Sequence, residues 1–323
     1  MPHKGKLAIC LLAIAAGTLD IQANAQTYPD HTINLVVGVT PGGLVDIVTR
    51  HAADQLQKKL GATIVVTTRT GAGGVVAAQS VVQSPSDGYT VLALTSGTFT
   101  AAELQTPQPY TINDLIPVAL IAEGGGVVIA VRKGLPISNL QELIAYAKAN
   151  PNKLNYGSSG SAGPVHLAIL QFLDLANIQM THIAYRGAVP ATQALLQGEV
   201  DLTLVDPNGF AQQIKDGTII PVARAGEPPA KGSENLPRLS DAVPGYDSKL
   251  WVGLAVPART PPAIVEKLNK TMSSIASEGL ITQPLATVGM MAKPMDQQAF
   301  QQYVVEDAQR WGNLIRKYKI TAQ

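Results

Sequence analysis

The chain is poor in cysteine, in charge and in long apolar runs. Its single cysteine, Cys10, lies in the first 25 residues, and no later stretch approaches the roughly 20 apolar residues of a membrane-spanning helix. Charged residues make up 15% of the chain and nearly cancel, giving a formal net charge of +1. Because no basic stripe disturbs this balance, we expect no nucleic-acid partner.

Signatures of metal, nucleotide and hydrolase chemistry are also missing. The sequence has no His-Glu-x-x-His motif, no P-loop and no Cys/His spacing typical of zinc sites. The serines at 158–161 resemble a nucleophile elbow, but neither Ser159 nor Ser161 has the two flanking glycines that this motif requires. We therefore predict a protein that is not an enzyme and that carries no metal and no cofactor.

The first 25 residues have the pattern of a secretory signal peptide. Lys4 and Lys6 precede an apolar segment, residues 7–19, and Ala23-Asn24-Ala25 fits the small-x-small cleavage rule. No twin-Arg pair is present, so we expect a Sec-type signal with cleavage after Ala25. Cleavage would remove Cys10 and leave a thiol-free exported protein, which points to the bacterial periplasm.

The remaining chain, about 300 residues, is long enough for two domains with real cores. Apolar strand-like runs alternate with helical patterns almost throughout, which predicts an α/β fold with mostly parallel sheets flanked by helices. Among the predicted elements are a strand at Ile33–Val37 and helices at Leu140–Ala149 and Pro262–Ser277. Similar strand-to-helix units begin near Val128 and Gly253, as expected for two crossovers between lobes. We expect one lobe at residues 26–126 plus 251–323, a second lobe at 127–250, and a ligand cleft between them.

Four turns share one construction, in which an apolar strand breaks into Gly, Ser or Thr and a helix follows at once. Such a turn presents free backbone N–H groups at the positive end of a helix dipole, where an anion is stabilised without a charged side chain. Two turns lie early and two lie in the middle of the chain, which suggests two lobes gripping one small anion. They occupy residues 36–50, 65–79, 154–170 and 182–196.

The ordered set of motifs resembles the tripartite tricarboxylate transporter solute receptors, also called Bug or TctC-like proteins. Each motif is weak alone, but together they follow the family order over nearly the whole mature chain. They are Pro41-Gly42-Gly43 with Asp46 and Arg50, Gly71-Ala72-Gly73-Gly74, Tyr156-Gly157-Ser158-Ser159-Gly160 with His166, Tyr185-Arg186-Gly187, Gly198-Glu199-Val200-Asp201, and Pro244-Gly245-Tyr246 with Trp251.

The resemblance implies a two-lobed type II periplasmic-binding-protein fold that closes on a small organic acid. It also implies delivery of that acid to membrane permease subunits, and we expect the receptor to be a monomer. Val39, Val45, Thr67-Thr68-Arg69-Thr70 and Val75 depart from the family pattern and make the lobe-one side less polar. These departures favour a bulkier or aromatic acid over aspartate or citrate.

The candidate ligand-binding residues come from the turns and from two further strand ends. They are Thr40, Pro41, Gly42, Gly43, Asp46, Gly71, Ala72, Gly73, Ser96, Thr98, Ser158, Ser159, Ser161, His166, Tyr185, Arg186, Gly187 and Asp206.

Several of these residues have an equally simple structural role. Asp46 could bond to N–H groups of its own helix start, the serines could be helix caps, and His166 could be a core residue. Arg186 could pair with a distal carboxylate or lie in solvent. Two other functions also stay open: an exported hydrolase or lyase that uses the same cleft, and a ligand-sensing partner of a membrane signalling protein.

Overall fold

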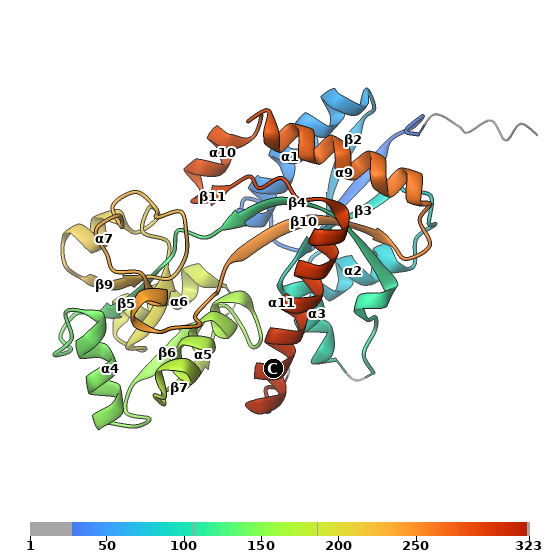
Figure 1. The fold of residues 1–323 in the computed structure, drawn as a ribbon. Helices are drawn as coiled ribbons and strands as arrows, with labels where there is room; N and C mark the ends of the chain where they lie inside the picture. Colours follow the sequence, from blue (N-terminus) through green and yellow to red (C-terminus); the bar gives the residue numbers. More distant parts are fainter. Residues whose placement is uncertain (1–27, 106, 186, 322–323) are drawn as a thin grey trace, which may run out of the picture.

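Two β-sheets organise the protein, and each defines one lobe (Figure 1). The computed structural model describes residues 28–321 except 106 and 186, so the expected signal peptide lies outside the described residues. Lobe 1 is built on a six-stranded sheet in the order β11-β4-β10-β3-β1-β2. Its strands are β1 (Ile33–Val37), β2 (Ile64–Thr68), β3 (Thr90–Thr95), β4 (Leu115–Gly124), β10 (Leu250–Pro257) and β11 (Met290–Met291).

Helices cover both faces of the lobe-1 sheet. One buried apolar cluster joins the sheet to α1 (Leu44–Leu60), α9 (Pro262–Ser277) and α10 (Thr282–Thr287). A second cluster joins it to α2 (Val75–Val82), α3 (Gly97–Glu103) and α11 (Gln297–Lys317). Two 3-10 turns, η1 (Ala72–Gly74) and η2 (Ile112–Asp114), complete the lobe.

Lobe 2 is built on a five-stranded sheet in the order β7-β6-β8-β5-β9. Its largest apolar cluster packs α4 and α5 against the sheet, and a smaller cluster packs α6. The strands are β5 (Val128–Arg132), β6 (Asn155–Ser158), β7 (Thr181–Ala184), β8 (Leu202–Val205) and β9 (Ile219–Arg224). The helices are α4 (Leu140–Ala149), α5 (Pro164–Ala176), α6 (Ala188–Gln197), α7 (Ala211–Lys215) and α8 (Leu239–Ala242).

Both sheets are mixed, which corrects the expectation of mostly parallel sheets. In lobe 1, β1 pairs in parallel with β2 and β3, whereas β10 runs antiparallel to β3 and β4. In lobe 2, β6 pairs in parallel with β7 and β8, whereas β5 runs antiparallel to β8 and β9. The reason is topological: β4 leads the chain into lobe 2 and β10 brings it back, so the two neighbours run in opposite directions.

The first crossover between the sheets is a run of three glycines, Gly124 to Gly126. Gly124 has φ +139°, and a Cβ added there would lie 2.8 Å from the carbonyl oxygen of Glu227. A Cβ on Gly126 would lie 2.6 Å from the Cβ of Ala230. Side chains are therefore excluded where the connecting strand passes between neighbouring loops. The division into residues 26–126 plus 251–323 and 127–250 stays our proposal for the lobe boundaries.

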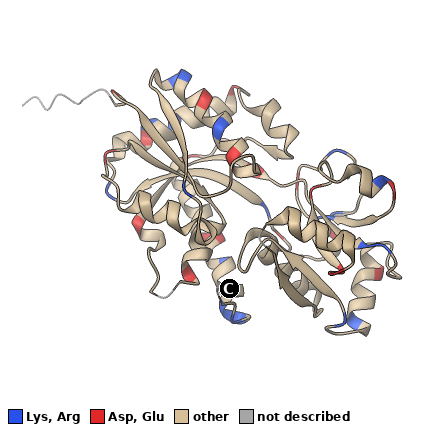
Figure 2. Cartoon of the chain, turned by 180° about the vertical axis from the view of Figure 1, so that it is seen from behind, with Lys and Arg blue, Asp and Glu red and all other residues tan. Residues whose placement is uncertain are grey.

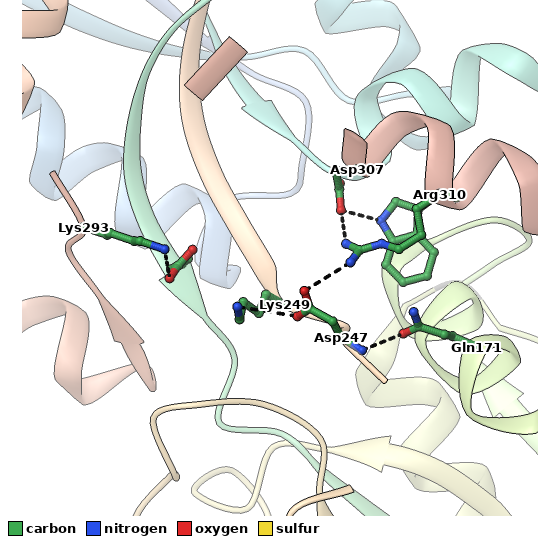
Figure 3. Close-up of polar contacts among 8 residues, drawn as sticks. Gln171, Asp247, Lys249, Lys293, Asp307 and Arg310 are labelled. Carbon is green, nitrogen blue, oxygen red and sulfur yellow. Dashed lines mark hydrogen bonds and ion pairs between the residues drawn. The ribbon is translucent and has the colours of Figure 1, made fainter. Parts of the chain in front are cut away.

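The second crossover is tied to both lobes by a polar network (Figure 3). The N–H of Asp247 donates to Gln171 on α5 at 3.3 Å, and its carboxylate accepts from Arg310 on α11 at 3.2 Å. Arg310 also pairs with Asp307, which accepts from the indole of Trp251 on β10 at 2.9 Å. The connecting segment before β10 is therefore held between a helix of each lobe.

Helix α11 also carries an apolar contact between the lobes. Trp311, Leu314 and Ile315 of α11 form one buried cluster with Ala162, Leu167 and Leu170 at the start of α5. Its C-terminal end lies close to lobe 2 (Figure 1).

Charged positions of both signs are scattered along both lobes in the view of Figure 2. No helix among residues 28–321, where described, combines the length and apolar character needed to cross a membrane. In the same residues no three His, Cys, Asp or Glu side chains gather as metal ligands would.

Candidate functional site

The first glycine turn is organised by Asp46. This residue is 3% exposed, and its carboxylate accepts from the N–H of Gly42 at 2.9 Å and from Arg50 at 3.0 Å. The hydrogen bond from Arg50 is the main cause that lowers the pKa of Asp46, with a smaller contribution from Gly42. The carboxylate of Asp46 therefore holds the turn before α1 in place and stays ionised there. Thr40, Pro41, Gly42 and Gly43 form this turn, and their ligand contacts stay predictions.

The second turn places free amides at its apex. Gly71, Gly73 and Gly74 have φ of +142°, +68° and +98°, and Ala72, which carries a side chain, has φ +45°. The N–H of Gly74 bonds to the carbonyl of Gly71 at 2.9 Å. Within the described residues, the N–H groups of Ala72 and Gly73 have no acceptor. The sequence folds this way because a left-handed backbone over successive residues selects glycine.

Thr98 stabilises the start of α3, and Ser96 directly precedes this helix. Thr98 accepts from the N–H of Thr95 at 3.1 Å through its hydroxyl, and its carbonyl accepts from Tyr110 at 2.7 Å. Ser96 is buried immediately before α3. Thr98 lines a small pocket of about 20 Å³ beside Val39 and Val45, so the lobe-1 side is partly apolar. Direct ligand contact by Ser96 and Thr98 stays a prediction.

The serine-rich turn in lobe 2 divides its hydroxyls between two tasks. Ser158 is fully buried, and its hydroxyl oxygen lies 2.6 Å from Nε2 of His182. This hydrogen bond gives Ser158 a structural role. Ser159 and Ser161 lie on either side of Gly160, which has φ +128°. In the described part of the chain, the backbone N–H groups of Ser159 and Ser161 donate to no acceptor.

A cavity of about 480 Å³ lies between the lobes and joins these two turns. Its lobe-1 wall includes Ala72 and Gly73, and its lobe-2 wall includes Ser159, Gly160 and Ser161. A volume of this size suits a small organic ligand. The remaining lining residues are Ala101, Leu104, Gln105, Ala184 and Tyr185.

The other candidate residues lie around this interlobe cavity or away from it. Tyr185 lines it and donates to Glu199 at 3.2 Å. Gly187, with φ +124°, caps the start of α6. Asp206 accepts from the N–H of Asn208 at 3.0 Å, so its carboxylate turns the chain after β8. Arg186 lies outside the described residues.

Residues of α3 and β7 were not found from the sequence. Ala101, Leu104 and Gln105 follow Ser96-Gly97-Thr98 by one to two helical turns, and Ala184 ends β7. Ala101 and Ala184 are small, and Leu104 and Gln105 lie just after the end of α3, so none of the four carries a chemical signature of binding. The only available signal was their position just after a strand end that was itself a candidate.

His166 and His182 form a stacked, uncharged pair. Their ring centroids are 3.8 Å apart and nearly parallel. Burial lowers the pKa of His166 to about 3, with a contribution from His182, and burial lowers the pKa of His182 to about 4. His166 does not line the interlobe cavity; its Nδ1 accepts from the N–H of Ala162 at 2.9 Å.

This pair predicts acid sensitivity. Below about pH 6.5 the two imidazoles bind protons in the unfolded chain but stay neutral in the folded chain. The free energy of unfolding therefore falls as the pH drops toward 4. We expect the free energy of unfolding to fall by roughly 2–4 kcal/mol between pH 7 and 4.5, after discounting for the partial exposure of His182. Urea titrations across this range measure it.

A double variant isolates the effect of the two histidines. His166→Asn keeps an acceptor at the position of Nδ1, and His182→Gln keeps a polar atom at the position of Nε2, but neither can ionise. The double variant should lose less stability than the wild type on acidification, whatever its stability at pH 7. Identical pH slopes would show that the pair does not titrate in this way.

Taken together, two mixed α/β sheets, two crossovers and a cavity between the lobes define the class of two-lobed solute-binding receptors. Comparison with known proteins identifies the group within this class. Residues 48–320 match the tripartite tricarboxylate transporter family receptor. A Cupriavidus necator protein, "UPF0065 protein in gbd 5'region", is 31% identical over 96% of this chain and 94% of that protein. The chain therefore belongs to the tripartite tricarboxylate transporter receptor family.

Solved structures agree with this assignment. The structure of R. palustris Rpa4515 with adipate matches with a TM-score of 0.77 at 28% identity, covering 92% of this chain and 100% of that chain. The periplasmic binding protein BugD matches with a TM-score of 0.74 at 26% identity, again over 92% of this chain and 100% of that chain. The fold predicted from the motifs is confirmed. Because the family consists of solute receptors, the hydrolase and lyase alternatives are set aside.

Proposed function

We propose that the protein is a periplasmic receptor that binds a small organic acid in the interlobe cavity. The observation that carries this proposal is one cavity lined from both lobes by turns whose backbone N–H groups have no acceptor among the described residues. Ala72 and Gly73 supply amides from lobe 1, and Ser159 and Ser161 supply them from lobe 2. Amide donors and helix N-termini stabilise a carboxylate without a counter-charge.

The cavity favours an acid with an apolar body. Ala101 and Leu104 line it from lobe 1, and Ala184 and Tyr185 line it from lobe 2. Burying the hydrocarbon part of a ligand against such a wall stabilises the complex, and a short polar acid has little hydrocarbon to bury. Adipate, the acid bound by the R. palustris relative, has charged ends and an apolar centre. We infer a dicarboxylate of that kind or an aromatic acid as the ligand.

We propose closure and delivery as the remaining steps. A ligand that contacts both walls prefers the closed arrangement of the lobes, and only this differential affinity shifts the equilibrium. The closed receptor, acting as a monomer, would then present its ligand to the permease subunits of a tripartite tricarboxylate-type transporter. Export by the signal peptide at residues 1–25 would place the receptor in the periplasm.

A thermal-shift panel of carboxylates tests the function. We expect one or a few acids with apolar bodies to raise Tm, and amides of the same acids to leave it unchanged. A ligand at one hundred times its Kd adds about 2.7 kcal/mol of stability. For a chain of this length that corresponds to a rise of roughly 5 °C in Tm. No shift with any acid at millimolar concentration contradicts the proposal.

A further inference from the structure

A second cavity, of about 510 Å³, lies on lobe 2 beneath the C-terminal segment. Its walls come from β6, the chain leading into β7, helix α5 and the residues that follow α11. Of its lining residues only Ser161 also lines the interlobe cavity. The proposed receptor function makes no use of this space.

Two buried polar side chains on its wall have unused donors. His166 is 4% exposed, and because its Nδ1 accepts from Ala162, the proton of the neutral ring is on Nε2. Tyr156 is 2% exposed. Among the described residues neither Nε2 of His166 nor the hydroxyl of Tyr156 has a hydrogen-bond partner. Because neither of these two atoms is closed off from solvent, both donors are available to a molecule in the cavity.

The neighbouring groups determine which kind of ligand these two donors can bind. His182 is stacked on His166 and is bonded to Ser158, so it holds the ring of His166 in place. Asp174, the acidic residue on the wall, already pairs with Lys317 at 2.5 Å. Lys319 also lines the cavity, and no carboxylate of the described residues forms an ion pair with it. The wall therefore offers two donors and one cation without a carboxylate partner, alongside the uncharged side chains of Ser161, Asn177 and Thr321.

Part of the remaining wall is hydrocarbon. Leu170 and Leu173 of α5, together with Ile178 and Met180 before β7, line the cavity. Ile320 faces them from the C-terminal segment. Donors and a cation in a cavity that also has hydrocarbon on its wall match a molecule that has one acceptor anion and an apolar body.

We propose that this cavity is a second binding site, for a small monocarboxylate with an apolar body. The carboxylate accepts from the hydroxyl of Tyr156 and from Nε2 of His166, and Lys319 supplies the counter-charge. The apolar body lies against the leucines of α5. Because the wall includes residues after α11, the bound molecule contacts segments attached to both lobes.

Benzoate is the probe, because it is rigid and loses little conformational entropy on binding. Calorimetric titration uses the full mature chain and its Ala72→Phe variant, in which the interlobe cavity is obstructed. We expect benzoate to bind the Ala72→Phe variant with a Kd within about threefold of the wild-type value for this site. Failure of benzoate to bind that variant at millimolar concentration would overturn the proposal.

Variants in the second cavity locate the binding. Tyr156→Phe with His166→Asn removes both donors while Asn preserves the bond to Ala162, and should weaken benzoate at least tenfold. Lys319→Ala, a change in an exposed side chain that does not endanger folding, should weaken benzoate severalfold and reduce its salt dependence. Unchanged affinity in both variants contradicts the proposal.

The outcome separates this site from the proposed function. If benzoate binds only the interlobe cavity, Ala72→Phe abolishes its binding and the second-site proposal fails while the receptor function stands. If no acid shifts the wild-type Tm through the interlobe cavity but benzoate still binds Ala72→Phe, the receptor proposal fails and the second site stands.

Discussion

Replacing Ala72 with phenylalanine is expected to abolish binding of organic acids in the interlobe cavity while leaving the fold intact. Ala72 lines the cavity beside the free amides of the second turn. Its backbone already holds a side chain at φ +45°, so the larger residue adds no new backbone restriction. A ring at this position takes the space that a carboxylate needs. Loss of two charge-assisted hydrogen bonds, about 1.5–3 kcal/mol each, lowers affinity at least about 100-fold.

Ala72→Gly is the matched control for this substitution. It keeps the backbone amides of residues 72 and 73 and creates no cavity in the core. The ligand-induced rise in Tm should therefore equal that of the wild type. Its own stability should stay within about 1 kcal/mol, because relief of the left-handed strain offsets the extra entropy of glycine in the unfolded chain. The measurement is the Tm of each variant with and without the best acid of the panel. Wild-type binding by Ala72→Phe would show that the acid does not contact this turn.

Local structure was largely readable from the sequence. The strand at Ile33–Val37 and the helices at Leu140–Ala149 and Pro262–Ser277 have the bounds that periodicity and end signals predict. Asn139 accepts from the N–H of Glu142 at 2.9 Å and so begins α4 at the predicted residue. These signals are local, because they depend on residues within one or two helical turns.

Strand direction was not readable in the same way. An apolar strand such as Leu250–Pro257 has the same pattern whether it runs parallel or antiparallel to its neighbours. Its place between β3 and β4 follows from the return of the chain from lobe 2, which is a long-range property. The expectation of mostly parallel sheets failed for this reason, although the two-lobed class was right.

The candidate site was predictable where backbone geometry determines it. Ala72, Gly73, Ser159, Ser161 and Tyr185 all line the interlobe cavity, and their turns stood out through glycine and serine. The role of a carboxylate or an imidazole depends instead on its partners. Asp46 is engaged by Arg50 and Gly42, and the ring of His166 faces a different cavity, contacts that a single sequence does not encode.

Asp307→Ala is expected to cause the largest loss of stability. Asp307 is 3% exposed and accepts from the indoles of Trp251 and Trp311, each at 2.9 Å, while Arg310 pairs with it (Figure 3). Burial raises the pKa of Asp307, against the opposing effect of Arg310. Removing the carboxylate leaves two buried indole N–H groups without their acceptor and takes from Arg310 one of its two carboxylate partners. We expect the free energy of unfolding to fall by about 3–5 kcal/mol in urea titrations.

Two further variants show whether the carboxylate itself is responsible. Asp307→Asn retains one acceptor oxygen and should cost about half as much, since one indole keeps its partner. Glu306→Gln alters the exposed neighbouring carboxylate, bonded to Gln302, and should change stability by less than about 0.5 kcal/mol. Because Arg310 also holds Asp247 beside α5, Asp307→Ala should loosen the second crossover and speed amide exchange there. A loss below about 1 kcal/mol would mean that the indoles find water instead, and that apolar packing alone anchors α11.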